Sequence, residues 1–424
     1  MNHNTPYADL TPDLILDAID GAGHVTSGSL LALNSYENRV YQVGLAEGGF
    51  LVAKFYRPGR WDDATILEEH EFALELAAQE IPVVAPLANG AGQTLHHFQG
   101  HRFALYPRRG GRAPELDDPE HLRWLGRMLG RIHSVGSLHS FQHRPSLNIQ
   151  SFGHDAMAFV LEQGFVPAEL SHNYRQACEV LLEQVATSFD MVGPYRRLRL
   201  HGDCHPGNIL WTDSGPHFVD LDDCMTGPAV QDLWMLLSGT RDDMRRQLDV
   251  LLEGYNTFFE FDLTQLILIE ALRALRLLHY SAWLARRWHD PAFPQAFPWF
   301  NTPRYWEDQL NTLREQAERL QRAAAVRHAL VLHGREQDGL FLGVVALVGE
   351  LAHEGDDGSQ ACRVRPVACG QFLIDGAQAV HHLQDVVMLV RELLDGVVMG
   401  HGGFLLEMGQ GQPPAALQIL SGKR

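Results

Sequence analysis

Residues 201–223 read HGDCHPGNILWTDSGPHFVDLDD, and this stretch decides how the rest of the chain is interpreted. Asn208 follows Asp203 by five residues, and Asp220 follows Asn208 by twelve. The glycine and proline residues around Asp203 favour a rigid turn. The segment HFV before Asp220 is short, mostly apolar and compatible with a β-strand, which predicts Asp220 where a buried strand ends. The stretch is therefore predicted to present a carboxylate and an amide from one loop and further carboxylates from a second.

Oxygen-bearing side chains at this spacing are typical of enzymes that transfer phosphate from ATP to a hydroxyl. The attacking hydroxyl must be oriented and must lose its proton, so Asp203 is predicted as the general base. Mg²⁺ prefers hard oxygen ligands, which predicts the amide of Asn208 and the carboxylate of Asp220. Asp222 and Asp223 crowd three carboxylates into four residues, a cluster that a cation would stabilise. An ordinary loop with helix-capping aspartates would suit an isolated HxD but explains less of this pattern.

A lysine far upstream fits the same chemistry. The chain has 34 lysines and arginines together, but Lys54 and Lys423 are its only lysines. Lys54 stands in FLVAKFY, an apolar strand-like run of the kind that carries the ATP lysine of kinases. A compact ammonium fits between phosphates where a planar guanidinium would be too wide. Lys54 is therefore predicted to bind the nucleotide, and the scarcity of lysine weakens the alternative of a surface residue.

A helix that follows is predicted to aim this lysine. Residues 66–76, ILEEHEFALEL, follow a helical pattern with Leu67, Phe72 and Leu76 predicted on or near one face. In kinases a glutamate from such a helix pairs with the lysine. Glu69 is the predicted partner of Lys54, because it continues the i, i+3, i+7 rhythm of the apolar face. Glu68 is the near alternative, and an acid-rich exposed face is the competing interpretation of either.

Two further nucleotide contacts are predicted in the N-terminal part. No GxGxxG motif precedes the lysine strand, and residues 33–41 read LNSYENRVY instead. This segment is predicted to form a hairpin in which Ser35 and nearby backbone amides touch the triphosphate. Residues 103–106, FALY, are interpreted as a strand and hinge between two lobes, where backbone groups near Tyr106 could hold adenine.

The segments HGDCHPGNIL, FVDLDD and GPAVQDLW resemble the aminoglycoside phosphotransferase and choline kinase superfamily. LNSYENRVYQV, VAKFYRPGRW, ILEEHEFALEL and DPAFPQAFPW are similar, more narrowly, to the stress response kinase A family of bacterial Ser/Thr protein kinases. The similarity runs from about residue 8 to about residue 320. It implies Asp203 as proton acceptor, Asn208 and Asp220 as magnesium ligands, Asp220 as a second active-site residue and Ser35 as an ATP-loop contact. It also implies ATP as co-substrate and Mg²⁺ as cofactor.

The expected fold is α+β and two-lobed, as in protein kinases. Residues 1–106 are predicted as a small β-rich lobe that binds nucleotide, and residues 107–324 as a larger helical lobe with the catalytic loop and the acceptor site. The patterns place strands near residues 30–33, 39–43 and 50–56 and helices near residues 65–79, 119–136 and 263–288.

The last hundred residues differ in composition from the rest. From Ala325 onward there is no Trp, Tyr, Thr or Asn, while 15 of the 39 glycines fall there. This part carries no motif and no family resemblance. Residues 325–424 are therefore an unassigned extension: an accessory domain, a loosely ordered tail or a stretch translated from a shifted reading frame, with the last two favoured.

Composition limits the partners and the location. A net charge of −18 argues against nucleic acid or an anionic membrane as the main partner. No apolar run reaches the roughly 18 residues of a membrane span, and the N-terminus lacks the basic start of a secretion signal, so a cytoplasmic monomer is expected. The five cysteines form no CxxC pair and no zinc spacing, so neither a disulfide framework nor a structural metal is expected. Cys204 and Cys224 adjoin site residues, and packed inert thiols are favoured over redox gating there.

Three functions are consistent with these features. The first is an ATP-dependent Ser/Thr protein kinase, which the closer resemblance implies. The second is a small-molecule kinase of the aminoglycoside, choline or homoserine kinase type, since the same catalytic parts would serve a small alcohol acceptor. The third is a nucleotide-binding regulator without catalysis. The joint presence of Lys54, Asp203, Asn208 and Asp220 argues against the third.

Overall fold

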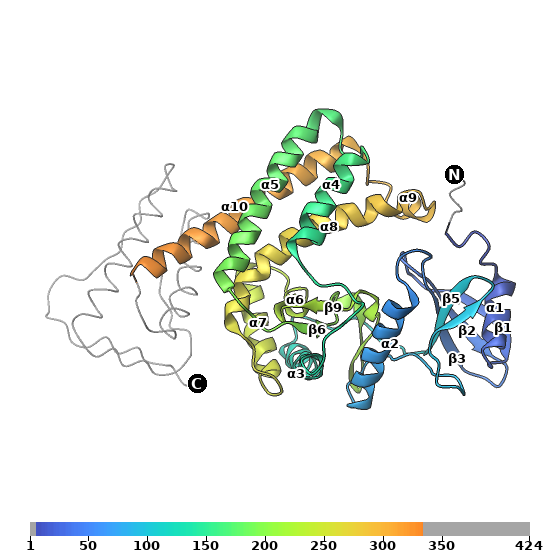
Figure 1. Cartoon of the computed structure of the whole chain (residues 1–424). Helices are drawn as coiled ribbons and strands as arrows, with labels where there is room; N and C mark the ends of the chain where they lie inside the picture. Colours follow the sequence, from blue (N-terminus) through green and yellow to red (C-terminus); the bar gives the residue numbers. More distant parts are fainter. Residues whose placement is uncertain (1–5, 334–424) are drawn as a thin grey trace. The chain divides into compact units, whose positions relative to one another are not determined.

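The N-terminal lobe is built on a five-stranded antiparallel sheet. The computed structural model describes residues 6–333 of the chain, and from residue 322 only their backbone. The strands lie in the order β1-β2-β3-β5-β4 (Figure 1). Their bounds are β1 (Thr26–Ala32), β2 (Arg39–Leu45), β3 (Phe50–Phe55), β4 (His96–Phe98) and β5 (His101–Pro107). Lys54 on the central strand β3 pairs with Val40 on β2 and with Ala104 on β5.

Two helices cover opposite faces of this sheet. α1 (Pro12–Gly21) begins at Thr11, whose hydroxyl accepts a hydrogen bond from the Leu14 N–H, and it packs on the face that buries Phe55. α2 (Asp63–Ala78) begins at Asp62 and contributes Ile66 to a second cluster. Because successive side chains of a strand point to opposite faces, Lys54 lies opposite to Phe55 and faces α2.

Helices dominate the C-terminal lobe. They are α3 (Pro119–Gly136), α4 (Asp155–Glu162), α5 (Ala168–Val192), α6 (Val230–Trp234), α7 (Arg241–Tyr255), α8 (Leu268–Arg287), α9 (Ala292–Ala296) and α10 (Pro303–His333). α3 packs closely on α7, because Gly126 and Gly130 of α3 and Gly254 of α7 leave no room for a Cβ at the contact. α8 packs against α4 and α5. No helix within residues 6–333 has the length and apolar character to cross a membrane.

Two strand pairs bring the loops of residues 201–223 together. β6 (Leu198–Leu200) pairs with β9 (Met225–Gly227), and β7 (Ile209–Thr212) pairs with β8 (Gly215–Phe218). The β6–β7 loop and the β8–β9 loop therefore emerge at the same end of these nested pairs. The backbone of Val219 donates to the Asn208 carbonyl at 3.0 Å, which joins the two loops directly.

The predicted α+β, two-lobed architecture is confirmed, with local corrections. The pattern over residues 119–136 matches α3, whereas that over residues 263–288 divides into η4 (Leu263–Ile267), a 3₁₀ turn, and α8. The prediction that Leu67 lies on the buried face of α2 is wrong: Leu67 is 38% exposed and Ile66 is fully buried. The lobe boundary after residue 106 stays a prediction. α10 continues through residue 325, and the remainder of the predicted extension, residues 334–424, lies outside the described residues.

Candidate active site

Asp232, on α6, fixes the backbone of the loop that carries the predicted base. Its carboxylate accepts hydrogen bonds from the backbone N–H groups of His201 and Gly202, both at 2.8 Å. Nε2 of His133 lies 3.0 Å from the same carboxylate, and both side chains are fully buried. Gly202 has φ +85°, and a Cβ there would collide with the carbonyl oxygen of Asp223. A buried carboxylate with this many donors holds the loop in one conformation.

Two side chains, those of Arg276 and His205, approach the carboxylate of Asp203. Nη1 of Arg276, on α8, lies 2.8 Å from Asp203 Oδ1. Nε2 of His205 lies 3.5 Å from Oδ2, and because His205 Nδ1 accepts from the Gly207 N–H, Nε2 is the nitrogen that carries the proton. Burial opposes ionisation, but His205 and Arg276 outweigh it and hold the pKa of Asp203 well below its ordinary range. Asp203 is therefore ionised and able to accept a proton.

Asn208 and Asp220 supply an amide and a carboxylate that fit a magnesium ion. The Asn208 Nδ2 donates to the Asp203 carbonyl at 3.0 Å, which leaves the amide oxygen available as a ligand. Asp220 is 53% exposed at its side chain and adopts a left-handed backbone (φ 59°, ψ 62°). Within residues 6–333 no three His, Cys, Asp or Glu side chains form a preformed metal cage. Mg²⁺ normally uses one or two carboxylates together with substrate phosphates, so this small donor set suits it.

Lys54 is the meeting point of three carboxylates. Its Nζ lies 3.1 Å from Asp220 Oδ1, 3.2 Å from Asp222 Oδ1 and 3.5 Å from Glu69 Oε1. The lysine side chain is only 8% exposed. Burial disfavours the ammonium, but the three carboxylates raise the pKa of Lys54 well above its ordinary value. Lys54 therefore stays charged, and Asp220 is the most exposed of its three carboxylate partners.

The pKa values of the two buried carboxylates that contact Lys54 shift in opposite directions. Burial raises the pKa of Glu69 to about 7, with Lys54 opposing and Asp222 reinforcing the rise. Asp222 is equally buried, but Arg60 and Lys54 overcome that burial and hold the pKa of Asp222 well below its ordinary range. Arg60 contacts Asp222 and Asp223 together. Near pH 7 the ionised carboxylate of Asp222 is thus the main buried negative partner of the Lys54 ammonium, while the Glu69 carboxyl is partly protonated.

Glu68, the near alternative to Glu69, has another partner. Its carboxylate accepts hydrogen bonds from the backbone N–H groups of His143 and Arg144 at 2.8 and 2.7 Å. Glu68 thus ties α2 to a loop of the C-terminal lobe and does not meet Lys54. Choosing between the two glutamates by the rhythm of the helix gave the residue that contacts the lysine.

The turn that carries Ser35 is tied to α8 through Glu37. The Trp283 Nε1–H donates to Glu37 Oε2 at 2.9 Å, and Arg287 Nε lies 2.6 Å from the same oxygen. Arg57 approaches the other oxygen at 3.1 Å. Ser35 itself is half-buried between β1 and β2. The position of this turn is therefore fixed by charged contacts with the other lobe as well as by its own strands.

Tyr106 directs its side chain into a buried polar cluster on the α2 side of the sheet, the side that Lys54 also faces. Its hydroxyl lies 3.0 Å from that of Tyr56, which in turn lies 2.7 Å from His70 Nε2. Thr94 contacts the other ring nitrogen of His70 at 2.8 Å. Burial lowers the pKa of His70 to about 3, so the cluster is neutral. Any contact of Tyr106 with adenine would therefore come from its backbone, as the sequence interpretation supposed.

Most of the predicted residues lie in one connected group, and Ser35 and Tyr106 lie outside it. Lys54 contacts Glu69 and Asp220, and Asn208 bonds both to Asp203 and, through its backbone, to the strand end before Asp220. In the turn that carries Ser35, Asn38 Nδ2 donates to Asp222 at 3.1 Å, and Glu37 lies 3.8 Å from Arg60, which contacts Asp222. Sequence reasoning missed several residues that complete the site: Arg60, Glu37, Asp222 as a lysine partner, Asp232, Arg276, Trp283 and Arg287.

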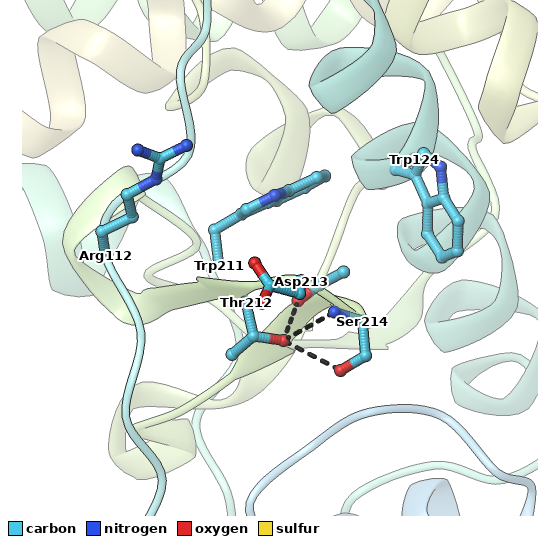
Figure 2. A pocket seen from close by; sticks show the side chains of 7 residues that line it. Arg112, Trp124, Trp211, Thr212, Asp213 and Ser214 are labelled. Atoms are coloured by element: carbon cyan, nitrogen blue, oxygen red, sulfur yellow. Dashed lines mark hydrogen bonds between the residues drawn. The ribbon is translucent and has the colours of Figure 1, made fainter.

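A separate pocket of about 660 Å³ lies at the far end of the β7–β8 hairpin. Figure 2 shows the indoles of Trp124 and Trp211, the guanidinium of Arg112 and the turn residues around it. The Thr212 hydroxyl is bonded to Ser214 within that turn. Asn208 precedes β7 and Asp220 follows β8, so the pocket lies at the opposite end of the hairpin from the predicted site.

The cysteines next to the site are packed and unreactive. Cys204 and Cys224 are fully buried and free. Burial raises the pKa of Cys224 to about 12 and that of Cys204 well above its ordinary value. A thiol that stays protonated is a poor nucleophile, which agrees with the interpretation of inert packing.

Comparison with known proteins identifies the class of enzyme. Residues 29–278 match the model of a family described as the phosphotransferase enzyme family. The match spans more than half of the chain and includes every predicted site residue. The fold and the site together therefore define a phosphotransferase.

Solved structures agree on the fold. An amicoumacin kinase in complex with AMP-PNP and Ca²⁺ is similar with a TM-score of 0.56 at 18% identity, covering 71% of this chain and 92% of that one. A microcompartment-associated aminopropanol kinase is similar with a TM-score of 0.54 at 17% identity, covering 73% and 98%. A spectinomycin phosphotransferase gives 0.53 at 15% identity, with the same coverage. At these identities the likeness shows the fold alone.

Curated relatives narrow the assignment. Stress response kinase A of Escherichia coli (strain K12) is 46% identical over 315 residues, covering 74% of this chain and 95% of the relative. The serine/threonine protein kinase RdoA of Salmonella typhimurium (strain LT2) is 44% identical over 319 residues, covering 75% and 96%. The chain is a kinase that belongs to the stress response kinase A family, as the sequence resemblance predicted.

Proposed function

We propose that this chain is a cytoplasmic, ATP- and Mg²⁺-dependent Ser/Thr protein kinase of the stress-response type, with Asp203 as general base. The observation that carries the proposal is the group formed by Lys54, Asp220, Asn208 and Asp203, which unites an ammonium with hard oxygen ligands and an ionised base. The names of the relatives support a protein hydroxyl as the acceptor.

The base acts through an oxygen of Asp203. The acceptor O–H gives its proton to this carboxylate while its oxygen forms a bond to the γ-phosphorus. The bond from that phosphorus to the β–γ bridging oxygen breaks, and ADP leaves with the electron pair. Asp232 supports this step indirectly, because it holds the loop backbone through His201 and Gly202. Positioning of this kind contributes much of the rate in phosphoryl transfer.

The remaining residues hold the nucleotide. Asn208 and Asp220 would bind Mg²⁺, which neutralises phosphate charge when bound. Lys54 stays charged and lies beside the exposed carboxylate of Asp220, where it would contact the phosphates. Ser35 would meet the triphosphate from the turn that Glu37 anchors. The backbone beside Tyr106 would hold adenine.

The test is transfer of label from γ-labelled ATP with Mg²⁺ to defined acceptors. The purified chain is incubated alone, with dephosphorylated casein, and with aminopropanol and spectinomycin as small alcohols. Label on serine or threonine of protein, located by mass spectrometry, supports the proposal. The Asp203→Asn variant is the control for contaminating kinases.

Other outcomes decide against it. Label on a small alcohol but on no protein would make the chain a small-molecule kinase. Label on neither, with Mg²⁺-dependent ATP binding intact by calorimetry, would favour a nucleotide-binding regulator.

A further inference from the structure

Arg276 contacts the predicted base, Asp203, but is not part of the sequence motif around Asp203. It lies 73 residues later in the chain, on α8, and its Nη1 is 2.8 Å from Asp203 Oδ1. α8 is firmly seated, because Ala274, Leu275 and Leu278 around Arg276 are buried. The Arg276 side chain is 45% exposed. A rigid helix thus delivers a cation to one oxygen of the carboxylate.

The two oxygens of Asp203 have different surroundings. Oδ1 has the short contact with Arg276, whereas Oδ2 has only long contacts, 3.4 Å to Asn208 Nδ2 and 3.5 Å to His205 Nε2. N–H···O hydrogen bonds in proteins usually span about 2.7–3.2 Å. Oδ2 therefore has only weak contacts and is the oxygen better able to take a proton, and the Arg276 contact fixes where it points.

We propose that Arg276 is a positioning residue for phosphate transfer: it clamps Oδ1 of Asp203 so that Oδ2 faces the acceptor hydroxyl. This inference rests on the proposed function, in which Asp203 is the base. Arg276 acts through Asp203 and not on the substrate. The helix that carries Arg276 also holds the Ser35 turn, because Trp283 and Arg287 contact Glu37 in that turn.

The charges around Asp203 come from three elements. His205 lies on its own loop, Arg276 on α8, and Asp223 follows the second loop as a like charge. Of the two groups that favour its ionised form, only Arg276 carries a permanent charge. Loss of Arg276 should therefore lower kcat with little change in the KM values, because the base is misplaced while the contacts that bind the substrates are kept. A merely structural role would weaken substrate binding or folding together with kcat.

The experiment compares Arg276→Gln and Arg276→Lys with Arg286→Gln. Arg286 lies on the same helix but stacks on Phe159, so its variant removes an equal charge without touching Asp203. Phosphate transfer to casein is measured, with kcat and the KM values for casein and ATP obtained separately.

The expected results are specific. Arg276→Gln should lower kcat by about 10- to 100-fold, the scale of a misplaced reacting group, while the KM values for casein and ATP stay close to those of the wild type. Arg276→Lys should recover part of the lost kcat, and Arg286→Gln should match the wild type.

Two kinds of failure can be told apart. A wild-type kcat in Arg276→Gln would overturn the positioning role, while transfer by the wild type still supports the proposed function. If the wild type itself transfers nothing, the proposed function fails and the positioning role falls with it.

Discussion

Replacement of Glu69 by glutamine should make the protein more stable at alkaline pH while impairing catalysis. Glu69 is 3% exposed and shares Lys54 with two other carboxylates, Asp220 and Asp222. Ionising Glu69 places a third negative charge next to one buried ammonium. Glutamine has nearly the same shape but stays uncharged, so the folded variant does not carry the free-energy cost of this buried charge.

The size of the effect follows from the pKa of Glu69. The carboxyl titrates at its ordinary value of 4.5 in the unfolded chain and at about 7 in the folded protein. The folded state therefore binds this proton more tightly, so the free energy of unfolding of the wild type falls as the pH rises from 4.5 to 7 and stays lower above 7. At about 1.4 kcal/mol per pH unit, the loss is about 3 kcal/mol.

The assay is urea unfolding of both proteins, followed by tryptophan fluorescence. Between about pH 5 and about pH 8.5, the stability of Glu69→Gln relative to the wild type should rise by about 2 to 3 kcal/mol. Glu71→Gln, an exposed change on the same helix, should show no such trend. Initial rates should meanwhile fall in Glu69→Gln, since Lys54 loses one of the groups that aim it. A stability difference that stays constant with pH would show that Glu69 is not protonated in the folded protein and would refute this reasoning.

Three further substitutions test individual roles. Asp203→Asn should slow transfer by about 10²- to 10⁴-fold while calorimetry still detects ATP binding, and unchanged turnover would remove Asp203 from the role of base. Asp220→Asn should abolish the Mg²⁺ dependence of ATP binding in the same experiment, so retained dependence would count against it as a ligand. Glu37→Gln weakens a charged bond between the Ser35 turn and α8, worth about 1.5–3 kcal/mol, and should raise the KM for ATP by about tenfold or more in initial-rate measurements. An unaltered KM would mean that this bond does not position the turn.

The residues that sequence reasoning proposed are those whose chemical role can be recognised from a short stretch of sequence. The spacing of Asp203, Asn208 and Asp220 fixes all three on two adjoining loops, and one interior lysine in an arginine-rich chain singles out Lys54. Strand alternation then places Lys54 toward the helix that carries Glu69. Each of these steps needs only a short window of sequence or a count.

The residues that were missed act over long sequence distances. Arg276 and Trp283 belong to a helix whose pattern shows only burial, and their partners, Asp203 and Glu37, lie 73 and 246 residues away. No local period encodes such pairs. The error at Leu67 has a simpler cause: it stands five positions before Phe72, about 140° around a helix, so the two cannot share a face.

The left-handed backbone at Asp220 has a consequence for anyone who randomises this position. Most side chains at φ near +60° raise the energy by about 1–2 kcal/mol, whereas glycine, asparagine and aspartate tolerate it. In a saturation library at residue 220, most variants would thus differ from the wild type in backbone strain as well as in side-chain chemistry. Glycine and asparagine tolerate this backbone but have no carboxylate, so they report on the loss of the carboxylate, whereas inactive clones with other side chains combine two defects.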